Sequence, residues 1–271
     1  MPLQYPKISC LTVTKNRLPA LKTAIRCYCD QTYPEKEMVI VSDGSAWYNA
    51  AVQRYLSELG RKDIRLVAIN ETCTLGKLRN ISISEATGNI ICQWDDDDLY
   101  HPDRLSIQFA KMTAENAKAC CMTDQLHYFY EERELFWCDW KAYESNPLYQ
   151  LIPGTIMMYK DKRFSYPETG SYAVSGEDSV FLAGIFETFP VAELSGMGYL
   201  YTYTFSGNNT FSEQHHRLLD EKYSMSADDV WKDEAKIREA LDYYLLPSPI
   251  KIIGYEQEIV FTWMFNYQSS L

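Results

Sequence analysis

The chain has 271 residues, of which 46 % are hydrophobic and 23 % charged, so it can bury a full core and wholesale disorder is excluded. Its formal net charge of −11 argues against a nucleic-acid partner, because binding to a phosphate backbone needs a basic face. Binding of an anionic substrate would therefore require positive charge at the site, from a bound cation or from helix N-termini.

The eight cysteines show no Cys-x-x-Cys spacing, so we do not expect a zinc site. Cys10, Cys92 and Cys120 lie inside apolar runs, where a reduced thiol behaves as a small hydrophobe. We expect no signal peptide, and the sequence has no apolar run of about 18 residues. We therefore expect a reducing, cytoplasmic location, with peripheral contact to the cytoplasmic face of a membrane left open.

Strands and helices alternate over the first hundred residues. Apolar strands are predicted at 8–14, 38–41, 64–69 and 90–93, with helices at 18–31 and 48–59 and from Gly76 to Gly88. Strands that are apolar throughout and alternate with helices indicate a mostly parallel sheet covered by helices on both faces. We therefore predict an α/β fold of the Rossmann-like kind.

The later elements are less regular. A helix is predicted after His101, strands at 120–130, 134–140 and 156–158, a helix after Gly176, and strands at 191–194 and 199–205. These strands favour a smaller mixed sheet. A polar loop at 207–217, an acidic amphipathic helix at 226–244 and an apolar-aromatic segment at 250–267 follow. We expect a catalytic domain over 1–205, with parts at 1–118 and 119–205, and a loop and helical extension over 206–271.

Polar clusters follow three of the predicted strands: Thr14 to Arg17, Ser42 to Ser45 and Asp95 to Asp98. Ligands of open parallel sheets bind at the carboxyl ends of the strands. The sequence therefore predicts a binding site where these clusters meet.

The four consecutive aspartates repel one another, so stability alone would not select them at a strand end. A hard divalent cation bound through oxygen ligands would relieve this repulsion. The alternative is a solvated acidic turn that precedes a helix, since aspartates favour helix N-termini.

Six motifs in order resemble those of an inverting family-2 glycosyltransferase with the GT-A fold, over about residues 7 to 190. They are the Asn16-Arg17 turn, Val41-Ser42-Asp43-Gly44-Ser45, Gly76 with Arg79-Asn80, Ala86-Thr87-Gly88-Asn89-Ile90, Trp94-Asp95-Asp96-Asp97-Asp98 and Gly176-Glu177-Asp178. Beyond residue 205 the resemblance is weak.

The resemblance implies roles for individual positions in binding a nucleotide sugar. Asp43 would contact the nucleotide base, Arg79 would lie near the base and the diphosphate, and Asp95 would hold the ribose. Asp97 would bind the metal, with the register between Asp97 and Asp98 left open. The other residues implied at the donor site are Thr14, Asn16, Arg17, Gly76 and Asp96.

The catalytic residue implied by the resemblance is Asp178, the general base that deprotonates the acceptor hydroxyl, with Glu177 beside it. His215 or His216 would be an additional metal ligand. Lys15 stands where an aromatic residue often stacks on the base, and Ser42 replaces the first acid of a common Asp-Asp pair. The identity of the base, expected to be uridine, is therefore open.

The resemblance implies a reaction between a nucleotide-diphosphate sugar and a hydroxyl of a saccharide or lipid-linked acceptor, in surface polysaccharide assembly. A bound Mn²⁺ or Mg²⁺ would neutralise charge on the diphosphate leaving group. A positioned carboxylate would take the proton of the acceptor hydroxyl, and displacement from the opposite face would invert the anomeric carbon.

Structural alternatives exist for each assignment. Asp43 could belong to an ordinary turn, Arg79 to a surface ion pair, Asp178 to a helix N-terminus, and His215-His216 to a solvated loop. Two other functions also remain open: a nucleotidyltransferase that forms sugar nucleotides, and a non-catalytic, metal-dependent carbohydrate-binding protein.

Two aromatic groups have no assigned role in this scheme. Core packing is favoured over a sugar-stacking floor for Trp137, Trp140 and Tyr143. The terminal stripe favours packing or homodimerisation over membrane contact, because only Lys251 is basic there. Its members are Ile252, Ile259, Trp263 and Tyr267.

Overall fold

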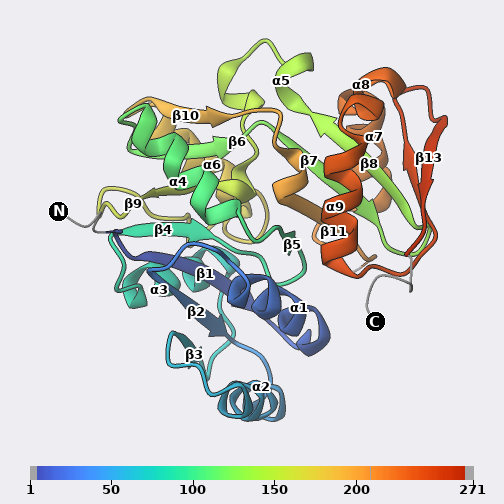
Figure 1. Cartoon of the computed structure of the whole chain (residues 1–271). Coiled ribbons are helices and arrows are strands. Elements are labelled where there is room, and N and C mark those ends of the chain that lie inside the picture. Colours follow the sequence, from blue (N-terminus) through green and yellow to red (C-terminus); the bar gives the residue numbers. More distant parts are fainter. Residues whose placement is uncertain (1–4, 208, 266–271) are drawn as a thin grey trace. The chain divides into compact units, whose positions relative to one another are not determined.

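The computed structural model describes residues 5–207 and 209–265. The chain divides into two compact units. The first unit comprises residues 1–98, 102–121 and 152–193, and the second comprises residues 99–101, 122–151 and 194–271. Each unit is built around its own β-sheet (Figure 1).

A seven-stranded sheet forms the centre of the first unit. Its strand order is β10 (Val191–Leu194), β6 (Ala119–Met122), β9 (Met157–Tyr159), β4 (Ile90–Gln93), β1 (Ile8–Thr14), β2 (Lys36–Ser42) and β3 (Ile64–Ala68). Strand β1 pairs in parallel with β2 and β4, and β2 pairs in parallel with β3. Strand β9 runs antiparallel to both β4 and β6. The predicted mostly parallel sheet is confirmed.

Three helices connect the parallel strands. These are α1 (Leu18–Cys29), α2 (Ala46–Leu59) and α3 (Leu75–Glu85). The connections through α1 and α2 step from β1 outward to β3, whereas α3 leads back past β1 to β4. Because such crossovers are right-handed, α3 lies on the opposite face of the sheet from α1 and α2. The order reverses between β1 and β4, and this reversal is the point where ligands of such sheets bind.

The first unit also contains the helices α4 (Arg104–Ala114) and α6 (Glu177–Phe186).

Side-chain caps define where two of the crossover helices begin. Ser45 accepts a hydrogen bond from the Tyr48 amide at the start of α2, and Thr74 accepts one from the Lys77 amide at the start of α3.

A six-stranded mixed sheet forms the second unit. Its order is β13 (Ile259–Trp263), β12 (Ile250–Ile253), β8 (Glu134–Asp139), β7 (Asp124–Phe129), β11 (Tyr201–Phe205) and β5 (Leu99–Tyr100). The β7–β8, β12–β13 and β5–β11 pairs are antiparallel, and the β7–β11 and β8–β12 pairs are parallel.

Each face of this sheet has an apolar cluster. One cluster includes Trp137 and the buried sides of α8 (Ala227–Lys232) and α9 (Glu234–Tyr244). The other includes Phe136, Cys138 and Tyr223, and Tyr223 is the last residue of α7 (Glu213–Tyr223). Neighbouring residues of β8 belong to different clusters because successive side chains of a strand point to opposite faces of the sheet. Trp137 is fully buried, so core packing is confirmed for this residue.

The structure corrects three expectations beyond residue 206. The predicted loop at 207–217 is wrong at its end, because α7 begins at Glu213 and Ser212 caps it through the His215 amide. The predicted helix at 226–244 is two helices, α8 and α9, that meet at Asp233. The segment at 250–267 is not helical, since it forms β12 and β13 at one edge of the second sheet.

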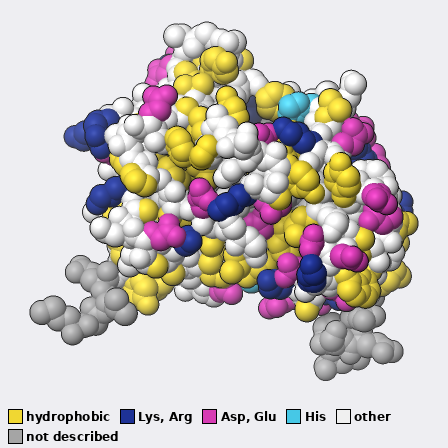
Figure 2. Space-filling view, turned by 90° about the horizontal axis from the view of Figure 1, so that it is seen from above, with side chains coloured by type: hydrophobic (Ala, Val, Ile, Leu, Met, Phe, Trp, Pro, Cys, Tyr) yellow, Lys and Arg dark blue, Asp and Glu magenta, His cyan; other side chains and the backbone are white. Residues whose placement is uncertain are grey.

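All eight cysteines are free thiols. Ile252 and Trp263 of the terminal stripe are buried, Ile259 is exposed, and Tyr267 lies outside the described residues. Among the described residues, no helix has the length and apolar character needed to cross a bilayer. Basic and acidic side chains are interspersed on the face drawn in Figure 2.

Glu37 of β2 ties three segments of the first unit together. Its Oε1 accepts hydrogen bonds from Ser9 Oγ at 2.6 Å, from the Thr87 amide at 2.6 Å and from the Gly88 amide at 3.1 Å. Its Oε2 accepts one from Arg65 Nη1 at 2.6 Å. Although burial alone would raise the pKa of Glu37, the hydrogen bonds from Ser9, Arg65 and Thr87 lower it to about 2.

We expect Glu37→Gln to lower the free energy of unfolding by about 2 kcal/mol at pH 7, because it weakens hydrogen bonds to a charged acceptor. The depressed pKa means that this stabilisation is present above about pH 4.5 and is lost as the pH falls toward 2. Thermal unfolding of both proteins from pH 7 to pH 3 measures the difference. The control is Glu35→Gln, which changes an exposed glutamate two residues before Glu37. A stability difference that stays constant down to pH 3 would contradict the assignment.

Candidate active site

The polar residues predicted at the strand ends lie at the point where the strand order reverses. Thr12 of β1 donates a hydrogen bond from Oγ1 to the Trp94 carbonyl at 2.8 Å, which joins β1 to the segment that follows β4. Thr14, at the end of β1, is buried, and its hydroxyl lies 2.5 Å from the Tyr48 hydroxyl. The loop after β1 and the aspartates after β4 are therefore fixed side by side.

Arg17 holds two of the four aspartates. Its Nη2 lies 2.8 Å from Asp96 Oδ1, and its Nη1 lies 2.5 Å from Asp97 Oδ2. Burial raises the pKa of both carboxyl groups, and their neighbouring negative charges raise it further, whereas the Arg17 charge lowers it. One guanidinium therefore offsets only part of the repulsion.

Arg79 of α3 joins Asp95 to Glu177, the first residue of α6. Its Nη2 lies 3.0 Å from Asp95 Oδ1, and its Nε lies 2.7 Å from Glu177 Oε1. The Arg79 side chain is only 9 % exposed and the Glu177 side chain 3 %. The surface ion pair considered for Arg79 is therefore wrong, and the buried bridge brings α6 to the aspartates.

Asp178 follows Glu177 in the first turn of α6, after Gly176, whose φ of 77° suits glycine. The Ser179 amide donates a hydrogen bond to Asp178 Oδ1 at 2.8 Å. Burial and the nearby Glu177 carboxylate raise the pKa of Asp178 to about 6, although Arg79 lowers it. A carboxylate with a pKa near the working pH suits general base catalysis.

Asp43 follows β2, and only one of its two carboxylate oxygens accepts hydrogen bonds from described residues. Its Oδ2 accepts from Lys15 Nζ at 2.9 Å and from the Cys73 amide at 3.3 Å. Its Oδ1 is buried and has no hydrogen-bond partner among the described residues. Asn16 accepts a hydrogen bond from the Ser45 amide at 3.1 Å, so the loops after β1 and β2 are linked.

Gly76 packs where no side chain fits. A Cβ built at this position would lie 1.9 Å from the Pro167 carbonyl oxygen, so the start of α3 approaches the chain near Tyr166 closely. This contact explains the glycine by backbone packing, and its role in donor binding stays a prediction.

His215 and His216 lie on α7 in the second unit. The imidazole of His215 stacks on Phe211 with ring centroids 4.6 Å apart. His216 is buried and stacks on Tyr203, and burial lowers its pKa to about 3. The expected loop is therefore a helix, and of the two side chains only His215 is solvated. Their role as metal ligands stays a prediction.

Three residues around the site were missed by sequence reasoning. Tyr166 stacks on Phe181 of α6 with ring centroids 4.1 Å apart and donates to Gln93 Oε1 at 3.1 Å. Gln93 donates in turn to Asp95 Oδ2 at 3.0 Å. Tyr48 contacts Thr14, as described above. No local pattern marks Tyr166 or Tyr48, because their partners Gln93 and Thr14 are distant in sequence.

We expect Arg79→Met to lower the free energy of unfolding by about 3–5 kcal/mol and the melting temperature by about 10 °C, because it removes the guanidinium that pairs with Asp95 and Glu177. Thermal unfolding measures this shift. Adding Glu177→Gln should restore part of the loss. The exposed Arg163, paired with Asp161, provides the control, and Arg163→Met should leave the melting temperature unchanged. Equal effects of Arg79→Met and Arg163→Met would refute the buried bridge.

Curated relatives match the first part of the chain. WcaA of Escherichia coli K12, named for a glycosyl transferase of colanic acid biosynthesis, is 36 % identical over 107 residues, which are 39 % of this chain and 37 % of WcaA. The cholesterol galactosyltransferase of Borreliella burgdorferi is 22 % identical over 122 residues, which are 45 % of this chain and 34 % of that protein. The chain thus spans about a third of the length of these relatives.

Solved structures match most of the chain in fold. TarS 1-349 of S. aureus, in complex with UDP, has a TM-score of 0.59 at 19 % identity, over 88 % of this chain and 70 % of TarS 1-349. The mannosyltransferase PcManGT of Pyrobaculum calidifontis, in complex with GDP-Man and Mn²⁺, has a TM-score of 0.57 at 14 % identity, over 90 % of this chain and 71 % of PcManGT.

The family model of glycosyl transferase family 2 matches residues 9–172, which are more than half of the chain. This range contains β1 to β4 and the aspartates that follow β4. The chain belongs to glycosyltransferase family 2, and it has the GT-A fold.

Proposed function

We propose that the chain is a metal-dependent, inverting glycosyltransferase that moves a sugar from a nucleotide-diphosphate donor, a UDP-sugar, to a hydroxyl of a saccharide or lipid-linked acceptor. One observation carries this proposal: the Arg79 bridge unites Asp95 with Glu177 and brings Asp178 to the end of β4. Donor-binding and proton-accepting groups then occupy one site of the first unit.

The residues at the end of β4 fit a divalent cation. Their carboxylate oxygens are the hard donors that Mg²⁺ and Mn²⁺ prefer. Asp96 Oδ2 is buried without a hydrogen-bond partner among the described residues, so Arg17, which pairs with Oδ1, compensates this carboxylate only in part. Asp97 and Asp95 would hold Mn²⁺ or Mg²⁺, which when bound neutralises charge on the departing diphosphate.

The chain's own residues bind and orient the donor. The unpartnered Oδ1 of Asp43 would accept a hydrogen bond from an N–H of the nucleotide base, and a uracil ring offers one. Thr14, Asn16 and Arg17 would line the same end of the sheet, beside Asp96. Gly76 would let α3 approach the chain closely, which places Arg79 at the centre of the site.

Asp178 takes the proton of the acceptor hydroxyl. Its carboxylate is held at the start of α6, and its raised pKa makes it a stronger base than an ordinary aspartate. The oxygen then attacks the anomeric carbon from the face opposite the leaving group, which inverts the configuration. Glu177 positions Arg79 and thereby limits the freedom of the neighbouring Asp178.

The acceptor class follows from the relatives by analogy. The printed name of WcaA refers to colanic acid biosynthesis, and that of the Borreliella protein to a galactosyltransferase acting on cholesterol. A surface polysaccharide or a lipid-linked saccharide is therefore the proposed acceptor. A cytoplasmic enzyme would reach it at the inner face of the membrane.

Donor binding is tested by thermal unfolding with UDP or GDP, each with and without Mn²⁺. A stabilisation by UDP that requires Mn²⁺ supports the proposal, since a ligand that binds only the folded state raises its stability. Stabilisation by GDP instead would correct the base, and no response to either diphosphate would contradict the proposal.

The variant Asp97→Ala should weaken Mn²⁺-dependent UDP binding about 100-fold, equivalent to about 2.7 kcal/mol, because the cation loses a carboxylate ligand. Isothermal titration at fixed Mn²⁺ measures the affinity. Asp161→Ala is the control, and Asp98→Asn tests which aspartate is the ligand. Unchanged UDP affinity in Asp97→Ala would exclude Asp97 from the metal site.

The variant Asp178→Asn should keep UDP affinity but lower kcat about 10²–10⁴-fold, since an amide cannot accept the proton. In the unsubstituted enzyme, protonation of Asp178 removes the base, so kcat should fall as the pH drops below about 6. Sugar transfer measured from pH 5 to 8 checks both effects. Full turnover by Asp178→Asn would remove Asp178 as the base.

A further inference from the structure

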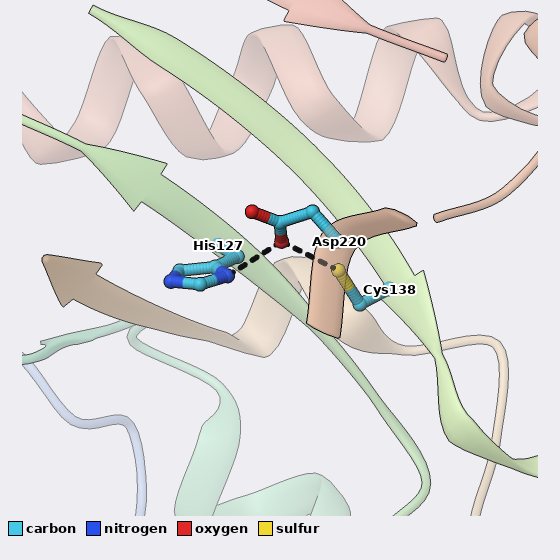
Figure 3. Close-up of side chains that lie close together, drawn as sticks. All are labelled: His127, Cys138 and Asp220. Atoms are coloured by element: carbon cyan, nitrogen blue, oxygen red, sulfur yellow. Dashed lines mark hydrogen bonds and ion pairs between the residues drawn. The ribbon is translucent and has the colours of Figure 1, made fainter. Parts of the chain in front are cut away.

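A second cluster of metal-ligating residues lies in the second unit. His127 of β7, Cys138 of β8 and Asp220 of α7 place one donor atom each within 4.8 Å of one another. All three residues are about 1 % exposed. Figure 3 shows the Asp220 carboxylate between the His127 ring and the Cys138 sulfur. Asp220 Oδ1 accepts from His127 Nδ1 at 2.7 Å and from Cys138 Sγ at 3.4 Å.

The fold brings these residues together through strand register. His127 pairs with Phe136 across the β7–β8 ladder, and Gln125 pairs with Cys138. Paired residues point to the same face, and so do residues two apart, so His127 and Cys138 are diagonal neighbours on one face. Helix α7 packs on this face through Tyr223, which places Asp220 over the pair.

Polar atoms of the cluster are left without partners. His127 Nε2 and Asp220 Oδ2 are buried with no hydrogen-bond partner among the described residues, and the same holds for His216 Nδ1. His216 lies four residues before Asp220 and therefore on the same side of α7. Its ring centroid is 5.2 Å from that of His127. Buried polar atoms are normally paired. Of these three atoms, His216 Nδ1 is the one that an ion bound to His127 Nδ1, Cys138 Sγ and Asp220 Oδ1 would take as its fourth ligand.

The donor set suits a zinc-type transition metal. Thiolate and imidazole ligands select zinc and similar ions, whereas Mg²⁺ and Ca²⁺ prefer oxygen. Ligand bonds of about 2.3 Å to sulfur and about 2.0 Å to oxygen in a tetrahedron place these two atoms about 3.5 Å apart. The distance between Cys138 Sγ and Asp220 Oδ1 is 3.4 Å, close to this spacing. The distance of 2.7 Å between His127 Nδ1 and Asp220 Oδ1 would lengthen by about 0.6 Å.

We propose that His127, Cys138 and Asp220 bind a zinc-type metal ion that fastens α7 to the sheet of the second unit. The ion replaces the thiol proton of Cys138, which leaves to solvent, and the proton on His127 Nδ1 moves to Nε2, so that a neutral imidazole binds through Nδ1. No electron is transferred. The fourth position belongs to His216 or to water, because structural zinc sites have four ligands. This site is separate from the aspartates after β4, which lie in the first unit.

Cobalt(II) is the probe, because thiolate ligation to it gives charge-transfer absorption that oxygen ligands alone do not give. The full chain, stripped with chelator and dialysed under reducing conditions, is titrated with Co²⁺ in excess Mg²⁺, which covers the aspartates. One equivalent should produce the thiolate band together with the visible bands of a tetrahedral ion. Zn²⁺ should then remove both, and metal analysis of the untreated protein should find about one zinc per chain.

Variants assign the ligands. Cys138→Ser should abolish the thiolate band, and Asp220→Asn should weaken Co²⁺ binding at least about tenfold. Cys121→Ser, which replaces an equally buried thiol in the first unit, is the matched control and should keep the band. His216→Gln should change the visible bands if His216 is the fourth ligand and leave them unchanged if water is.

The measurement on the unsubstituted chain decides the proposal even if a variant fails to fold. Absence of the thiolate band at several equivalents of Co²⁺, together with no zinc in the untreated protein, would overturn it. The cluster would then be a hydrogen-bonded network only. Retention of the band in Cys138→Ser, with its loss in Cys121→Ser, would equally overturn the ligand assignment.

Discussion

Repulsion among consecutive carboxylates after β4 is the constraint on which the first unit depends. Two arginines reduce this repulsion by pairing with different aspartates. Asp95 forms an ion pair with Arg79, whereas Asp96 and Asp97 form ion pairs with Arg17. The two arginines come from different segments, the loop after β1 and helix α3, so the aspartates can adopt this arrangement only when both crossovers have folded. The strand end is thereby coupled to β1 and to α3.

Arg79 extends this coupling to α6 through Glu177. Around the two guanidinium groups stand five carboxylates, those of Asp95, Asp96, Asp97, Glu177 and Asp178, so negative charge remains in excess. Burial, and then this excess, raises the pKa values of Asp96, Asp97 and Asp178. A diphosphate would be repelled from such a site without a cation. Burial and the same excess raise the pKa of Asp178, which suits the role of general base proposed for it.

Sequence patterns predicted the first unit well, because its apolar strands alternate with helices and the polar clusters follow the strand ends. They failed where partners are distant: Arg79 and Glu177 lie 98 residues apart, and nothing local shows that they meet. Helix α7 was taken for a loop because its polar first turn follows a glycine- and asparagine-rich stretch. The C-terminal strands were missed because a short apolar run suits a strand or a helix equally well, and pairing with β8 decides between them.

The cluster in the second unit illustrates the same limit in chemical terms. Zinc sites are predicted from short spacings between ligands, and His127, Cys138 and Asp220 have none, since Asp220 follows Cys138 by 82 residues. Register and helix packing make them neighbours instead. The cluster offers nitrogen and sulfur donors, whereas the aspartates after β4 offer only oxygen donors. Soft donors such as thiolate favour zinc-type ions, and oxygen donors favour Mg²⁺ and Mn²⁺. The two proposed sites therefore suit different ions: the thiolate and imidazole of the second unit select a zinc-type ion, whereas the carboxylates after β4 suit Mg²⁺ or Mn²⁺.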